Sequence, residues 1–66
     1  MKLHYDEQTD ALYLRLDESH IVESEEVQPG IVLDFDATGG VVGVEILRVA
    51  ERLPHANLRQ IQFEVA

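Results

Sequence analysis

The sequence contains no cysteine and no long hydrophobic run. The lack of cysteine excludes disulfides, thiolate zinc sites and cysteine nucleophiles together. No segment approaches the roughly 18 consecutive apolar residues of a membrane-spanning helix, and the opening MKLHYDE lacks the apolar core of a signal peptide. We therefore expect a cytoplasmic protein without a membrane partner.

Basic residues are also scarce, since five Lys and Arg stand against 13 Asp and Glu and leave a net charge of −8. The electrostatic field of this negative charge repels the phosphate backbones of nucleic acids, whose affinity for proteins comes mainly from basic side chains that displace counterions. Direct nucleic-acid binding is therefore disfavoured. The acidic charge has two other interpretations: it keeps a small domain soluble, or it attracts a basic partner, whether protein or cation.

A chain of 66 residues predicts a single domain, residues 1–66. At about this size folding buries only ~60% of the surface that the unfolded chain exposes, so stability usually needs a disulfide, a metal or a partner chain. Because cysteine is absent, a metal or a partner chain remains.

Two stretches share one alternating pattern. In LHYDEQTDALYLRL, residues 3–16, apolar residues alternate with others on both sides of a polar break, which predicts a β-hairpin. A loop of residues 7–10 places Tyr5 opposite Leu12 and Leu3 opposite Leu14, all on one face. LDFDATGGVVGVEI repeats the pattern over residues 33–46.

In this second copy, a loop of residues 37–40 contains a Gly-Gly pair that supplies the positive φ such loops need. It places Phe35 opposite Val42 and Leu33 opposite Val44. The sequence therefore predicts the same hairpin twice.

The segment IVESEEVQPG between the hairpins predicts a third strand, with a bulge or an exposed edge, and then a turn at Pro29 and Gly30. RVAERL is a short helix that ends before Pro54. RQIQFEVA alternates again and is either a sixth strand or a tail that orders only on pairing. The predicted fold class is α+β and mostly β: an antiparallel five-stranded meander of two similar hairpins over residues 1–47, a short C-terminal helix over 48–53, and a tail or terminal strand over 54–66.

The predicted sheet has one broad apolar face. A helix of about two turns spans roughly 10 Å and cannot cover such a sheet. A second copy of the chain, or its own terminal strand and helix folded across together, must therefore do so. We expect a homodimer in which folding and association are inseparable. The predicted face comprises Leu3, Tyr5, Leu12, Leu14, Leu16, Ile31, Leu33, Phe35, Val42, Val44 and Ile46.

One segment matches a metal-binding template. DFDATGGVVGVE scans against the calcium loop D-x-[DN]-x-[DN]-G-x5-E, with Asp34, Asp36 and Glu45 on ligand positions and Thr38 in place of the third ligand. The calcium loop needs a helix on each side, whereas both flanks here alternate like strands. A weak cation site of another kind at these three carboxylates is the metal hypothesis.

No catalytic constellation is evident, and we predict no catalytic residue and no cofactor. The serines lack a nucleophile elbow, and no glycine-rich phosphate loop is present. The histidines, at positions 4, 20 and 55, do not have the short spacings of zinc ligands. In the third strand, Glu23, Glu25 and Glu26 are instead candidate contacts for a basic partner.

Four sequence blocks agree in order and spacing with a known family: YD at residues 5–6, DALYLRL at 10–16, SEEVQPGIVLDFD at 24–36 and VVGVEIL at 41–47. Over roughly residues 1–53 the chain resembles the small prokaryotic proteins catalogued as domain of unknown function 2283. The resemblance implies a free-standing single domain, and some members are similar to the acidic partner in candidate toxin–antitoxin gene pairs. It implies no activity, cofactor or catalytic residue.

The sequence therefore favours a non-enzymatic interaction module, a small acidic homo-oligomer that binds a basic protein such as a toxin. The alternative is a metal- or small-ligand-binding protein, or an enzyme, with its site near Asp34 and Glu45 at a homodimer interface. Operator-DNA binding through Arg48, Arg52 and Arg59 ranks below both, because these residues make a thin basic segment.

Overall fold

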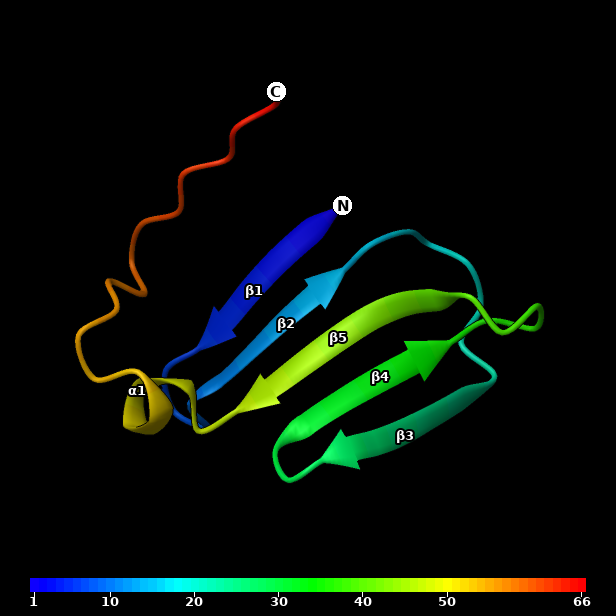
Figure 1. Ribbon diagram of the computed structural model, residues 1–66, viewed down its shortest axis with the longest axis horizontal. Coiled ribbons are helices and arrows are strands. Elements are labelled where there is room, and N and C mark those ends of the chain that lie inside the picture. The colour runs from blue at the N-terminus through cyan, green and yellow to red at the C-terminus, as the bar shows by residue number, and fades with distance from the viewer.

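Five antiparallel strands form one open sheet in the computed structural model, which describes residues 1–66 (Figure 1). One short helix follows the last strand, and no helix of the chain is long and apolar enough to cross a membrane. The predicted fold class is thus confirmed. The elements are β1 (Lys2–Asp6), β2 (Ala11–Arg15), β3 (Glu23–Gln28), β4 (Ile31–Phe35), β5 (Val41–Leu47) and α1 (Val49–Arg52).

The strand order across the sheet is β1-β2-β5-β4-β3. Consecutive strands pair as β1–β2, β3–β4 and β4–β5, and β5 also pairs with β2. The connection from β2 to β3 passes the end of the sheet and reaches its far edge (Figure 1). The most apolar strand, VVGVEIL of β5, is therefore central, whereas ESEEVQ of β3 lies at an edge.

The first hairpin has the register that its sequence pattern predicts. Leu3 pairs with Leu14 and Tyr5 pairs with Leu12, across a loop of residues 7–10. The carboxylate of Asp6 holds this loop, because it accepts hydrogen bonds from the backbone N–H groups that follow it, at 2.9 and 3.4 Å.

The second hairpin departs from the prediction at one position. Leu33 pairs with Val44 as expected, but Phe35 pairs with Val41, so the predicted pair of Phe35 with Val42 is wrong. The register shifts because Asp34 is still opposite Gly43, which leaves Val42 as an extra residue on β5. This bulge puts Val42 among the few buried side chains, and its carbonyl accepts a hydrogen bond from the Leu16 N–H at 2.7 Å.

The third strand and the C-terminal region follow the predicted outline. β3 lies at the edge, and its register shifts between Glu26 and Gln28, so both predicted irregularities are present. Helix α1 falls within the predicted range of 48–53. Residues 54–66 form turns and extended chain without a sixth strand.

Asp10 joins the first hairpin to α1. Its backbone is left-handed, with a φ of 55°, and its carboxylate accepts hydrogen bonds from the N–H groups of Ala50 at 2.8 Å and Glu51 at 3.4 Å. The Tyr5 hydroxyl donates to the same carboxylate at 2.7 Å. These bonds to Ala50 and Tyr5 lower the pKa of Asp10, and the hydrogen bond to Asp10 raises the pKa of Tyr5 to about 12. The Asp10 carboxylate therefore stabilises the contact between the first hairpin and α1.

The sheet has an apolar and a polar face, and little lies over the apolar one. Only Val42 and Val49 are buried apolar side chains, each 2% exposed. Antiparallel partners share a face, so the pairing defines an apolar face of Leu3, Tyr5, Leu12, Leu14, Ile31, Leu33, Val44 and Ile46, to which the alternation along β4 adds Phe35. The opposite, polar face carries Lys2, His4, Tyr13, Arg15, Ser24, Glu26, Val32, Asp34, Gly43 and Glu45.

Candidate functional site

The polar face is organised around a carboxylate from the middle of β4. Asp34 accepts a hydrogen bond from the Tyr13 hydroxyl at 2.7 Å and another from the Ser24 hydroxyl at 2.6 Å. Three strands, β2, β3 and β4, thus contribute one side chain each to this polar cluster of Tyr13, Ser24 and Asp34. Burial, and then the hydrogen bond to Asp34, raise the pKa of Tyr13.

Gly43 in β5 leaves room for this cluster. It pairs with Arg15 on one side and with Asp34 on the other, so it lies between the strands whose side chains meet above it. A Cβ at this position would overlap the Tyr13 hydroxyl and would lie 2.7 Å from Oδ2 of Asp34. The hydrogen bond between Tyr13 and Asp34 therefore depends on a residue without a side chain.

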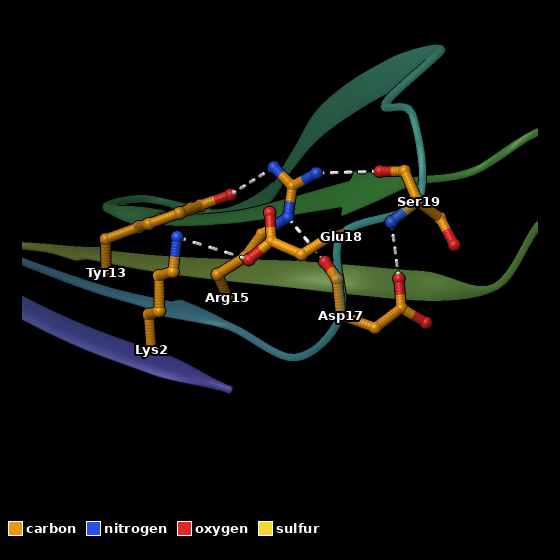
Figure 2. Close-up of polar contacts among 6 residues, drawn as sticks. All are labelled: Lys2, Tyr13, Arg15, Asp17, Glu18 and Ser19. Carbon is orange, nitrogen blue, oxygen red and sulfur yellow. Dashed lines mark hydrogen bonds and ion pairs between the residues drawn. The ribbon is translucent and has the colours of Figure 1, made fainter.

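Arg15 extends the network to the connection between β2 and β3, as Figure 2 shows. Its guanidinium donates to the carbonyl of Asp17 at 2.6 Å and to that of Ser19 at 2.7 Å, and it reaches the Tyr13 hydroxyl at 3.5 Å. Asp17 in turn accepts the Ser19 N–H at 2.8 Å, a bond that lowers the pKa of Asp17. The arginine thus fixes the start of the connection that carries the chain to the far edge of the sheet.

A peripheral ion pair completes this view. The Lys2 ammonium lies 3.5 Å from the Glu18 carboxylate, and both side chains are exposed (Figure 2). Exposed pairs of this kind contribute little stability, because solvent screens them. The hydrogen bonds of Arg15 are the stronger restraint on this part of the chain.

The three carboxylates of the metal hypothesis have different surroundings. Asp34 and Glu45 share the polar face, whereas Asp36 lies in the loop between β4 and β5. Asp36 accepts hydrogen bonds from the Thr38 N–H at 2.9 Å, the Thr38 hydroxyl at 2.7 Å and the Gly40 N–H at 2.9 Å. These bonds, led by the Thr38 hydroxyl, lower the pKa of Asp36.

Some of the oxygens of these three carboxylates are engaged within the chain. Both carboxylate oxygens of Asp34 accept hydroxyl hydrogen bonds, and one oxygen of Asp36 holds its own loop. No group of three or more His, Cys, Asp or Glu side chains has a geometry that could hold a metal ion. The flanks of the DFDATGGVVGVE segment are strands, as predicted.

The three glutamates predicted to bind a partner lie together on the edge strand β3. All six residues of this strand are exposed. Glu23 and Glu25 pair with Phe35 and Leu33 and so border the apolar face, whereas Glu26 is on the polar face. The ion pairs of the chain involve Glu7 and Glu18, so these three carboxylates have no cationic partner within it.

The polar cluster is what sequence reasoning missed. The sequence pattern indicates Asp34 as a candidate cation ligand and does not connect it with its hydroxyl partners, Tyr13 and Ser24. The available signal was Gly43, because a glycine inside an apolar strand marks a bulge or a close approach of other groups. Both occur here, with the bulge at Val42 and the hydroxyl of Tyr13 above the glycine.

The chain matches a known protein family. The family model described as "Protein of unknown function (DUF2283)" matches residues 2–49, which run from the first residue of β1 to the first residue of α1. No curated protein and no solved structure matches the chain.

Proposed function

The chain belongs to the DUF2283 family of proteins of unknown function, and we propose that it is a non-enzymatic module that binds a basic partner protein along β3. The family assigns no activity, so the support comes from the geometry of this strand. The observation that carries the proposal is that an exposed edge strand bears three glutamates without cationic partners.

An edge strand offers backbone groups to a second chain. Its outward N–H and C=O groups have no partner in the sheet, and an extended peptide can pair with them as an added strand. The alternate side chains of β3 would then lie beside those of the added strand. Backbone pairing would supply affinity, and the side chains would supply the choice of partner.

The glutamates restrict which strand can add at this edge. Like charges placed side by side disfavour a wrong partner, whereas complementary charges speed association and fix its register. An acidic strand is therefore rejected, and a strand with lysine or arginine opposite Glu23, Glu25 and Glu26 is favoured. A basic toxin is one such partner, and binding of its basic strand to β3 would be an antitoxin-like role.

Affinity purification tests this proposal. The tagged full-length chain is compared in its native host with E23Q/E25Q/E26Q and with the matched control E7Q/E18Q/E51Q, which has the same net charge and alters exposed residues elsewhere. We expect wild type and control to recover the same basic protein, which high salt releases and the β3 variant loses. Recovery of that protein by all three chains, or of no basic protein by any, would contradict the proposal.

A further inference from the structure

The apolar face of the sheet is only partly covered by the chain that forms it. Eight of its side chains lie in two cross-strand rows, Leu3–Leu14–Val44–Leu33 and Tyr5–Leu12–Ile46–Ile31. The edge residue Leu3 is 41% exposed, the other seven are half-buried, and residues 57–61 lie beside Leu3, Tyr5 and Leu12. Helix α1 has four residues and lies at one end of the sheet, where Asp10 holds it, so it leaves the middle of the face open (Figure 1).

The accessible surface area of the chain is larger than that of a compact monomer of the same mass. A compact monomer of 7.5 kDa is expected to expose about 4250 Å², whereas this chain exposes 5147 Å², about 900 Å² more. A stable interface of standard size removes about 800 Å² from each partner. One such interface would therefore bring the chain to the exposure of an ordinary folded protein.

The C-terminal tail, residues 60–66, adds to the uncovered surface. Its apolar side chains Ile61, Phe63 and Val65 are 67%, 73% and 83% exposed. They alternate with Gln60, Gln62 and Glu64, as in a strand with one apolar side. In Figure 1 the tail runs along the outer side of β1 towards the N-terminus.

An open, wholly apolar gap separates the tail from the sheet. Its volume is about 500 Å³, and it is lined by Met1, Leu3, Leu14, Ile61 and Phe63. A gap of this size exceeds what close-packed protein interiors leave empty. The tail thus lies near the apolar face without packing on it, and the space between them can receive several apolar side chains.

We propose that the apolar face and the tail together form the contact surface for a second copy of this chain, in a two-fold dimer. Two copies offer each other the same broad apolar surface, which is the self-complementarity that a two-fold interface needs. Facing sheets pack about 10 Å apart, with their inner side chains interdigitated. The side chains of one copy then fill the gap beside the tail of the other.

This dimer goes beyond partner binding at β3 and does not depend on it. Glu23 and Glu25 border the apolar face, and each copy has a net charge of −8, so electrostatic repulsion opposes the dimer. Added salt screens that repulsion. Homodimerisation is therefore expected to tighten with salt, whereas binding of a basic partner weakens, and the two proposals fail separately.

Sedimentation equilibrium of the full chain gives the test, with two adjacent substitutions in β4. Leu33→Lys changes the apolar face and Val32→Lys the polar face, and each new lysine has a glutamate of β3 opposite it, Glu25 or Glu26. We expect wild type and V32K to have twice the 7.5 kDa mass of the chain, and L33K to be monomeric. A monomeric wild type would overturn the dimer, and a dimeric L33K would overturn the choice of face.

The tail is tested separately, which also keeps the proposal testable should L33K fail to fold. Replacing Ile61, Phe63 and Val65 by serine removes the apolar side of the tail, whereas Q60S/Q62S/E64S alters its other side. Because burial of even one such side chain is worth about tenfold in affinity, we expect the first variant to raise the dimer Kd at least about tenfold and the second to leave it nearly unchanged. Equal Kd values would overturn the role of the tail.

Discussion

Substitution of Gly43 by alanine probes the polar cluster most directly. The Tyr13 hydroxyl donates to Asp34 at 2.7 Å in the space that the glycine leaves. An alanine Cβ overlaps that hydroxyl and lies 2.7 Å from Oδ2 of Asp34. Because Gly43 is buried in the central strand, its backbone cannot move away without disturbing the pairing with β2 and β4. The two side chains must therefore separate.

The expected cost follows from the interactions involved. Loss of a hydrogen bond to a charged acceptor costs about 1.5–3 kcal/mol, and crowding of a packed site adds about 1–3 kcal/mol. Alanine regains about 0.5–1 kcal/mol, because it loses less backbone entropy than glycine in a strand. Partial exposure of the cluster puts the result near the lower end, so we expect G43A to lower the free energy of unfolding by about 2 kcal/mol.

Urea denaturation at one fixed protein concentration measures this cost in G43A, Y13F and the double variant. Y13F has already lost the hydroxyl that the new Cβ overlaps and its hydrogen bond to Asp34, so G43A should cost at least about 1.5 kcal/mol less in that background than in wild type. Additive effects, or a G43A chain as stable as wild type, would refute the proposed dependence of the Tyr13–Asp34 hydrogen bond on Gly43.

Two further predictions concern titration. Asp10→Asn should return the pKa of Tyr5 from about 12 towards its ordinary value of 10.0, because the charged acceptor of its hydrogen bond is lost. Ultraviolet titration of the Tyr5 phenol measures this change. The Tyr5 contribution to stability is present below pH 10.0 and is lost as the pH rises through about 12. Asp10, Asp17 and Asp36 have pKa values lowered from 3.8, so each stabilises the fold above that pH and loses its contribution as the pH falls through its lowered folded-state pKa. Urea denaturation over a pH series should show that the free energy of unfolding falls below about pH 4. The fall should be less steep in Asp36→Asn than in wild type. Equal pH dependence of the free energy of unfolding in D36N and wild type would argue against the role of Asp36 in its loop.

The first hairpin could be predicted in full because it uses only local information. Alternation, a polar break of residues 7–10 and matched apolar positions together allow one register, and Leu3–Leu14 and Tyr5–Leu12 are the observed pairs. A slip by one residue would turn both strands inside out. The same reasoning located the second hairpin and its Leu33–Val44 pair.

The features that could not be predicted depend on contacts between distant segments. The placement of β5 between β2 and β4 depends on which strand is most favourable at the centre of the sheet. The sequence pattern of each segment alone does not contain this comparison. The displacement of Phe35 onto Val41 depends on the bulge at Val42. The Tyr13 hydroxyl is brought to Asp34 only by the pairing of both strands with β5, so the local sequence does not show this hydrogen bond. In sequence alone, Asp34 therefore resembles a cation ligand.

The dimer proposed above predicts a melting temperature that depends on protein concentration, because the second copy binds only the folded chain. Unfolding of two 66-residue chains has an entropy of about 0.28 kcal/mol/K, and a 100-fold dilution weakens a dimer by about 2.7 kcal/mol. We therefore expect the Tm to fall by about 10 °C on 100-fold dilution. The same Tm at both concentrations would show that the chain folds alone and would contradict the dimer.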